Sequence, residues 1–140
     1  MICTSWAWPN MFDVARNKVG LLSDVTSIVN RTKLLMLTEP TEMYMCPNFG
    51  VGLKKYMFNY NNDNVIAMIK DSLIEQLRLW EPAVVPEKTT VTRGLKYSQS
   101  GNVSSVAKAV DNLDLTVTLE TRYGQSVSFG VTTDDINGLK

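Results

Sequence analysis

The segment from Asp63 to Trp80 has the periodicity of a long amphipathic helix. Its apolar side chains recur at spacings of three and four residues and fall on one helical face: Val65, Ile66, Ile69, Leu73, Leu77 and Trp80. Polar residues from Asn59 to Asn64 supply candidate N-caps. Pro82 follows, and the residue before a proline disfavours the helical conformation. We therefore predict a helix over 63–80, about 27 Å long, that lines one side of a domain.

After Pro82 the period changes from that of a helix to that of a strand. The run from Val84 to Thr92 is rich in valine and threonine and predicts a strand, which Pro86 places at a sheet edge or a strand start. Apolar and polar residues then alternate, with the apolar ones at Leu113, Leu115, Val117, Leu119, Val127, Phe129 and Val131. The turn from Tyr123 to Gln125 interrupts the alternation, so we predict a hairpin with one buried face.

A second helix is expected upstream, between Leu22 and Leu37. It begins near Ser23 or Asp24, which are both good caps, and its second half is compatible with either a helix or an extended segment. The residues from Thr38 to Glu42 end it.

Two shorter segments lie between the predicted helices. We expect Met43 to Cys46 to form a short extended segment that leads into Pro47. Gly50-Val51-Gly52 predicts a turn entering a helix, with the following apolar side chains contacting the core: Leu53, Tyr56, Met57 and Phe58.

The order of these elements predicts an α+β fold. Helices precede strands, so we expect N-terminal helices packed on one face of a small, mainly antiparallel sheet that ends in a C-terminal hairpin. A chain of 140 residues is long enough for one domain with its own core. We predict an N-terminal arm over 1–21 and a single domain over 22–140, which includes a long polar connection from Gly94 to Asn112.

The composition argues against several classes of function. Lysine plus arginine and aspartate plus glutamate both number 14, without a basic stripe, which argues against a nucleic-acid partner. Histidine, the commonest general base and metal ligand, is absent. Cys3 and Cys46 are too far apart for a CxxC pair, so we expect free thiols, although a disulfide between them stays open. We therefore predict no metal and no cofactor.

No apolar run approaches the roughly 20 residues that span a bilayer. We accordingly expect no membrane partner and a protein that is made and kept on the cytoplasmic side. Near the start of the sequence, Trp6 and Trp8 form a costly patch if they are exposed. They either fold back on the domain or dock on a neighbouring subunit.

Catalysis would have to rest on carboxylates, and the candidates in one region are Asp71, Glu75 and Glu81. Asp71 and Glu75 lie one helical turn apart, an arrangement typical of an ordinary solvated helix surface. The stretch from Gly50 to Gly52 lacks the third glycine of a dinucleotide fingerprint and the lysine of a phosphate-binding loop. We predict no catalytic residue.

Two motifs, in this order, carry a resemblance to a known family. The first is Pro47-Asn48-Phe49-Gly50-Val51-Gly52-Leu53, followed by Met57-Phe58, and the second is Trp80-Glu81-Pro82 at the end of the long helix. The chain resembles the contractile-tail baseplate wedge and sheath-initiator family, which includes the equivalent subunit of type VI secretion baseplates. The resemblance extends over roughly 22–131.

The sequence departs from the family pattern at two positions. Ala83 stands where the family usually has an arginine after Glu-Pro. Glu81 must then be exposed, capped by backbone amides, or paired with a basic residue from elsewhere, such as Arg78 or Arg93. Thr41 stands where the resembling Thr-x-x-Gly-Glu pattern has its glycine.

The resemblance implies an architectural role and not an enzymatic one. It implies a protein of the virion tail baseplate, present in several copies in a sixfold assembly, that contacts other wedge proteins, the tail tube or hub proteins and the tail sheath protein. The residues that we expect at these interfaces are Trp80, Glu81, Pro82, Pro47, Phe49, Gly50, Val127, Phe129 and Val131. Proline, glycine and phenylalanine in the first motif are equally expected as fold determinants.

The segment from Val127 to Thr132 is the predicted edge strand through which a sheath subunit extends the sheet, unless the chain itself closes that edge. Two alternatives to the sheath-initiator role stay open. The family has been labelled lysozyme-like, which predicts two opposed carboxylates in a cleft. A generic secretion-system adaptor would bind one partner through its tryptophans.

Overall fold

The computed structural model describes residues 5–6, 12–13, 17–22, 24–57, 59, 62–93 and 114–132. The predictions made above for Cys3, Trp8, Phe58, Leu113 and the connection from Gly94 to Asn112 lie outside these residues. No helix in the described part of the chain is both long and apolar enough to cross a bilayer.

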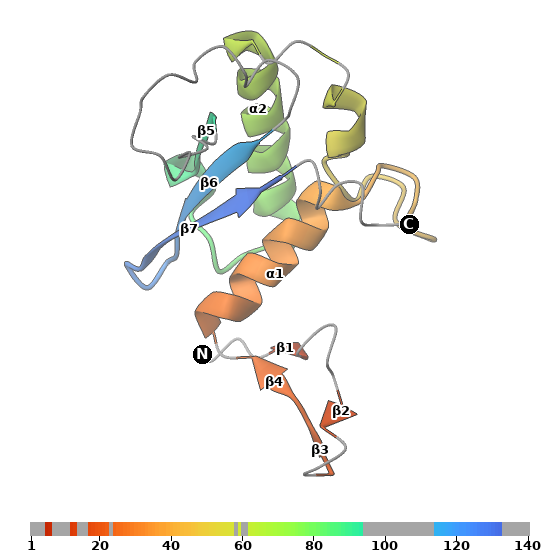
Figure 1. Cartoon of the computed structure of the whole chain (residues 1–140), viewed down its shortest axis with the longest axis vertical. Helices are drawn as coiled ribbons and strands as arrows, with labels where there is room; N and C mark the ends of the chain where they lie inside the picture. The colour runs from red at the N-terminus through yellow and green to blue at the C-terminus, as the bar shows by residue number, and fades with distance from the viewer. Residues whose placement is uncertain are drawn as a thin grey trace, which may run out of the picture.

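Two α-helices form the first layer of the domain (Figure 1). Helix α1 spans Asp24–Leu37 and is helical throughout, which decides between the two alternatives for its second half. Helix α2 spans Asp63–Trp80, the bounds that the periodicity predicts. Between them lies a short 3-10 helix, η1, at Leu53–Tyr56.

The second layer is a three-stranded antiparallel sheet of order β5-β6-β7. Strand β5 spans Thr90–Arg93, β6 spans Leu115–Glu120 and β7 spans Ser126–Val131. The hairpin between β6 and β7 is confirmed, with Val117 opposite Phe129. Gly124 adopts a φ of 78° in its turn, a conformation that favours glycine.

The predicted strand from Val84 to Thr92 is wrong in its first half. Val84 makes only an isolated bridge to Thr121, and Pro86–Lys88 forms a 3-10 helix, η2. Pro86 causes this break because its ring fixes φ and it has no N–H for a ladder. The continuous strand therefore begins only at Thr90.

The predicted extended segment from Met43 to Cys46 is also wrong. These residues form turns, and both Thr41 and Met45 have left-handed backbone conformations, with φ of 77° and 69°. An extended strand needs a negative φ, so the chain doubles back here.

The core lies between the helices and one face of the sheet, as the α+β prediction requires. The buried residues of β6 alternate with partly exposed ones, so that only one face of the sheet is buried. Helix α1 contacts β7, α2 contacts β5, and the helices contact each other. The buried apolar side chains of this single cluster are Ile28, Leu35, Met36, Val51, Leu53, Tyr56, Ile69, Leu73, Leu77, Ala83, Val84, Val91, Leu115, Val117, Leu119, Phe129 and Val131.

The described residues before α1 form two short antiparallel ribbons, here called the arm, beyond the N-terminal end of this helix (Figure 1). Strand β1, Ser5–Trp6, pairs with β4, Leu21–Leu22, and β2, Phe12–Asp13, pairs with β3, Lys18–Val19. None of the described arm residues belongs to the core cluster.

Each of the two ribbons of the arm has an exposed apolar pair on one face. Trp6 lies directly opposite Leu21 and Phe12 directly opposite Val19, and directly opposed residues share a face of a ribbon. The exposed fractions are 67% for Trp6, 63% for Leu21, 73% for Phe12 and 49% for Val19. Of the two alternatives for the tryptophans, folding back onto the domain therefore does not describe Trp6.

Candidate functional site

The site is built at the C-terminal end of α2. Glu81 follows the last helical residue, and its N–H donates to the carbonyl oxygen of Leu77 at 3.0 Å. The chain then turns, because Pro82 cannot continue the helix and the N–H of Val84 donates to the Glu81 carbonyl oxygen at 3.2 Å. This turn directs the Glu81 side chain inward, where the residue is only 5% exposed.

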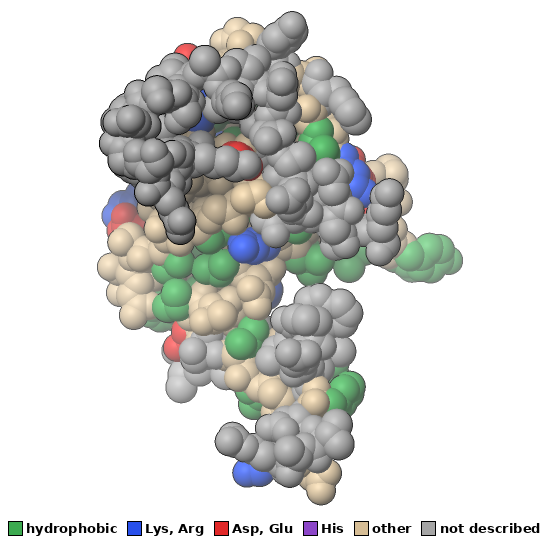
Figure 2. Space-filling model, in the orientation of Figure 1, with side chains coloured by type: hydrophobic (Ala, Val, Ile, Leu, Met, Phe, Trp, Pro, Cys, Tyr) green, Lys and Arg blue, Asp and Glu red, His purple; other side chains and the backbone are tan. Residues whose placement is uncertain are grey.

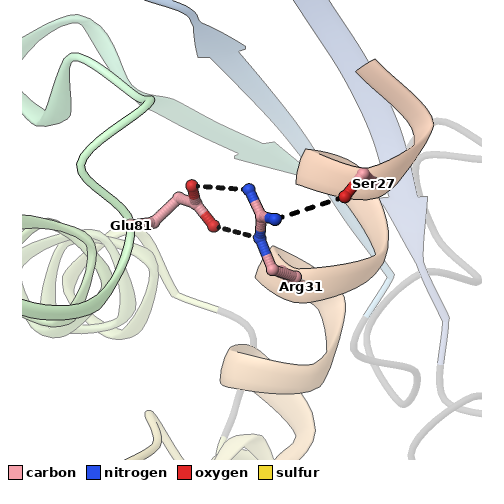
Figure 3. Close-up of polar contacts among 3 residues, drawn as sticks. All are labelled: Ser27, Arg31 and Glu81. Carbon is pink, nitrogen blue, oxygen red and sulfur yellow. Dashed lines mark hydrogen bonds and ion pairs between the residues drawn. The ribbon is translucent and has the colours of Figure 1, made fainter. Parts of the chain in front are cut away.

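Arg31 of α1 neutralises the buried Glu81 carboxylate (Figure 3). Its Nε donates to Oε2 at 2.7 Å and its Nη2 donates to Oε1 at 2.9 Å, the two-pronged geometry of a strong arginine–carboxylate pair. Its Nη1 donates to the Ser27 hydroxyl at 3.2 Å, one helical turn back. A buried carboxylate needs such a partner, so this pair joins the end of α2 to the middle of α1.

Of the three alternatives for Glu81, the structure shows pairing with a basic residue from elsewhere, but the partner is Arg31 and neither Arg78 nor Arg93. Arg78 pairs with Glu87 at 3.4 Å and Arg93 pairs with Asp63 at 2.7 Å, both at the exposed surface. The signal for Arg31 was present, because it lies three residues after Ile28 and four before Leu35 on the buried stripe of α1. A guanidinium at such a position needs a buried anion as its partner.

Ala83, at the place of the family arginine, is buried at 8% exposure in the core. Its carbonyl oxygen accepts from the N–H of Arg122 at 3.0 Å. A small apolar residue therefore fits here, and the charge that balances Glu81 comes from α1 instead.

Trp80 and Phe49 meet beside the ion pair. Their rings are 5.2 Å apart in an edge-to-face arrangement with an interplanar angle of 77°. Together with Leu34, Arg31 and Glu81 they line a shallow, mainly apolar pocket of about 150 Å³. Because Trp80 is 44% exposed and Leu34 is 54% exposed, the pocket presents apolar surface around a buried charge pair.

Gln76 holds the Phe49 loop against α2. Its Oε1 accepts from the N–H of Gly50 at 3.1 Å, and its Nε2 donates to the carbonyl oxygen of Asn48 at 2.9 Å. Pro47, two residues before Phe49, is exposed.

Gly50 is where the loop passes closest to α1. Its φ is 105°, and a Cβ atom on it would lie 2.3 Å from the carbonyl oxygen of Thr38. Directly after this contact, the N–H groups of Val51 and Gly52 donate to the carbonyl oxygens of Leu35 and Thr38, both at 3.0 Å. Only glycine fits here, so the geometry at Gly50 supports a role in the fold.

The remaining expected interface residues lie apart from this pocket. Pro82 is exposed and lines a second hollow of about 170 Å³ with Arg78 and Glu87. In β7, Phe129 and Val131 are buried and Val127 is half-buried, so their side chains face the core. A partner that binds β7 would therefore contact the main chain of this strand more than its apolar side chains.

The arrangement gives little support to chemistry at the carboxylates. Asp71 and Glu75 are exposed on α2, whereas Glu81 has both oxygens engaged by Arg31. Within the described ranges, acidic and thiol side chains do not gather into any group of three suited to hold a metal ion. Cys46 is a free thiol.

The fold and the site describe a small α+β domain with exposed apolar side chains beside a buried ion pair. Residues 23–111 match the family Baseplate wedge protein gp25, and the chain belongs to this family. The resemblance seen in the sequence is thereby confirmed, and the family gives the chain a structural role in a phage-type tail baseplate.

Two solved structures share the fold. A chain of the sixfold-symmetrised cryo-EM structure of the anti-feeding prophage baseplate is 19% identical, with a TM-score of 0.57, and the match covers 91% of this chain and 85% of that chain. A crystal structure of a protein called a tail lysozyme, from Geobacter sulfurreducens, is 20% identical, with a TM-score of 0.53, and the match covers 76% of this chain and 86% of that chain. No curated protein matches the sequence.

Proposed function

We propose that this baseplate protein joins the wedge to the tail tube and starts assembly of the sheath by adding the edge of β7 to a sheath strand. It acts in several copies per baseplate, in contact with wedge, tube and sheath proteins, and it catalyses no reaction. The observation that carries the sheath role is the sheet order β5-β6-β7, which leaves the outer side of β7 unpaired among the described residues.

The geometry of the hairpin indicates which groups of β7 are available. The N–H of Thr121 donates to the carbonyl oxygen of Gln125 at 2.8 Å, and hydrogen-bonded pairs alternate with non-bonded ones along an antiparallel ladder. Ser126, Ser128 and Gly130, which face residues of β6 in the intervening pairs, thus direct their N–H groups outward. An added strand would bind these groups through main-chain hydrogen bonds.

The wedge contact is proposed at the pocket of Trp80 and Phe49. Exposed apolar surface around a fixed ion pair has the character of an interface centre, in which aromatic side chains dominate the binding energy. The Arg31–Glu81 pair sets the position of this pocket because it joins the two helices that form its walls.

The test of the sheath role uses a proline at the outer edge. Ser128→Pro removes one outward N–H and leaves the buried side chains of β7 in place, so we expect the folded variant to lose the ability to seed sheath polymerisation. Purified protein is mixed with the sheath subunit of its own gene neighbourhood, and the product is imaged by electron microscopy. Ser128→Ala is the matched control, because it keeps the N–H, and should seed normally.

Equal seeding by the proline and alanine variants would contradict strand addition at β7. The lysozyme-like alternative is tested separately with purified peptidoglycan. Cleavage by the protein, lost in Glu81→Gln, would overturn the non-enzymatic role.

The exposed apolar pairs of the arm favour a second candidate function, that of an adaptor bound through its N-terminal segment. Trp6 is 67% exposed, as such an adaptor requires. Removal of 1–10 would abolish partner binding by an adaptor, whereas sheath seeding through β7 would persist.

A further inference from the structure

The loop between α1 and η1 ends in a prominent apolar tip. Met43, Tyr44 and Met45, here called the knob, are 47%, 91% and 82% exposed. Figure 2 shows a hydrophobic projection at the right-hand edge of the molecule, where this loop lies in Figure 1. Three consecutive large apolar side chains exposed at one tip are unusual for a surface that meets only water.

The loop holds the knob in one conformation. The N–H of Thr41 donates to the carbonyl oxygen of Pro47 at 2.9 Å, which closes the loop across its neck. Within the tip, the N–H of Cys46 donates to the carbonyl oxygen of Met43 at 3.3 Å. These bonds restrain the main chain of the knob, so its backbone has less freedom to lose when it binds.

The base of the loop is anchored to the domain through Glu39. Its Oε1 accepts from the N–H of Lys54 at 3.1 Å, and its own N–H donates to Oε2 of Glu42 at 3.0 Å. Gly52 makes room for this carboxylate, since a Cβ atom there would lie 2.7 Å from Oε2 of Glu39.

Two residues of this loop have strained backbone conformations. Thr41 and Met45 have φ of 77° and 69°, a region that side chains with a Cβ atom disfavour. Strained conformations of this kind gather at sites that contact ligands and partners. Met45 is 82% exposed, so packing of its side chain in the core does not account for its left-handed conformation.

We infer that the knob inserts into an apolar cavity of the wedge protein that also contacts the pocket of Trp80 and Phe49. This inference rests on the proposed function. Phe49, which lines the pocket, follows Met45 by four residues, so a short segment of chain joins the knob to the pocket. A single partner can contact both.

The size of the knob argues for a larger partner and against a second copy of this chain. It exposes on the order of 400 Å², taking about 150–250 Å² for each large side chain. A stable interface needs roughly 800 Å² from each partner. Two knobs in mutual contact supply only about half of that area, so the partner must also cover surface beyond the knob, such as the exposed parts of Trp80 and Leu34.

Charge argues for a protein cavity and against a lipid surface or a nucleic acid. The segment 39–48 contains Glu39 and Glu42 and no lysine or arginine. Anionic lipids and phosphates would be repelled by these carboxylates. An uncharged apolar cavity would accept the knob with the acidic residues at its rim.

The test places a photoreactive benzoylphenylalanine at position 44 of the full chain and irradiates assembled baseplates. Position 123 is the matched control, because Tyr123 is also a highly exposed tyrosine, at 60%, but lies at the β6–β7 turn. We expect position 44 to cross-link to one wedge protein, at residues that line an apolar cavity, and position 123 to give no product with that cavity.

The cross-linked wedge protein is then purified for affinity measurements. Tyr44→Ser should weaken its binding by about tenfold or more, and Tyr123→Ser by less than about twofold. Cross-linking only to another copy of the chain, or none in particles that contain the protein, would overturn the inference while the baseplate role stands. Absence of the protein from assembled particles would overturn the proposed function itself.

Discussion

At the residue scale, Gly50 is a position where the fold leaves no room for a side chain. A Cβ atom there would meet the carbonyl oxygen of Thr38 at 2.3 Å, and the φ of 105° adds strain for any other residue. Gly124 has a φ of 78° but nothing within 4 Å of a Cβ atom. Substitutions at the two glycines therefore distinguish the free-energy cost of a steric clash from the cost of the left-handed conformation alone.

We predict that Gly50→Ala lowers the free energy of unfolding by roughly 3 kcal/mol or more, because main-chain atoms must move. Gly124→Ala should lower it by only about 1 kcal/mol, the cost of the left-handed conformation alone. Urea denaturation followed by circular dichroism measures both. Equal losses in the two variants would show that the close approach at Thr38 is not the cause.

The Arg31–Glu81 pair gives a second prediction at this scale. Arg31→Met leaves the Glu81 carboxylate buried without its cation, and we expect a loss of about 2–4 kcal/mol in the free energy of unfolding. Combining it with Glu81→Leu should recover most of that loss, because an apolar pair replaces a charged one. Arg78→Met, at an exposed pair, should change the same quantity by about 0.5 kcal/mol or less.

Denaturant titration of the single and double variants provides the measurement. If the double variant is as unstable as Arg31→Met alone, the cost does not come from an uncompensated buried charge.

At the scale of elements, the sequence predicted those parts whose boundaries are marked locally. Polar residues precede helix α2 and Pro82 follows it, so its limits of Asp63 and Trp80 were predicted correctly, although the N-cap residue Asn62 makes no side-chain capping hydrogen bond. The β6–β7 hairpin was equally visible, because strict alternation reports a strand with one buried face.

The missed elements depart from the preference of most of their residues. Val84 pairs with Thr121 and the N–H of Val85 donates to the carbonyl oxygen of Glu120 at 2.8 Å, but Pro86 ends this pairing before β5 begins. The turns at Met43–Cys46 need positive φ at residues that rarely adopt it, and local preference predicts the opposite.

The residues of the candidate site were predicted only in part. Trp80, Phe49 and Glu81 were selected from motifs, and the structure brings them to one pocket. Arg31 was missed because it lies 50 residues from Glu81, and spacing within one helix does not identify a partner on another.

At the scale of the whole molecule, the arm and the domain are expected to be independent in stability. The described residues before Asp24 contribute nothing to the core cluster, although β1 contacts α1. We predict that a variant lacking 1–21 keeps the free energy of unfolding within about 1 kcal/mol of the full chain.

Thermal and urea unfolding of the two proteins, measured side by side, check this prediction. A much larger loss would mean that the arm belongs to the folded unit, and the proposed division into 1–21 and 22–140 would be withdrawn. An unchanged domain would make the arm available for contacts that form only in the assembled baseplate.

The position of α1 at the start of the domain also affects how the protein is synthesised. Its buried stripe packs against α2 and against β7, the last strand of the sheet. The ribosome adds about 5–20 residues per second, so β7 emerges roughly 5–20 s after α1, about 90 residues later. During that interval Ile28, Leu35 and Met36 lack their final neighbours. The Arg31 guanidinium also has no ion-pair partner at this site until Glu81 has been synthesised. Translation speed thus sets how long a nascent chain displays an uncovered apolar helix to chaperones and to other nascent chains.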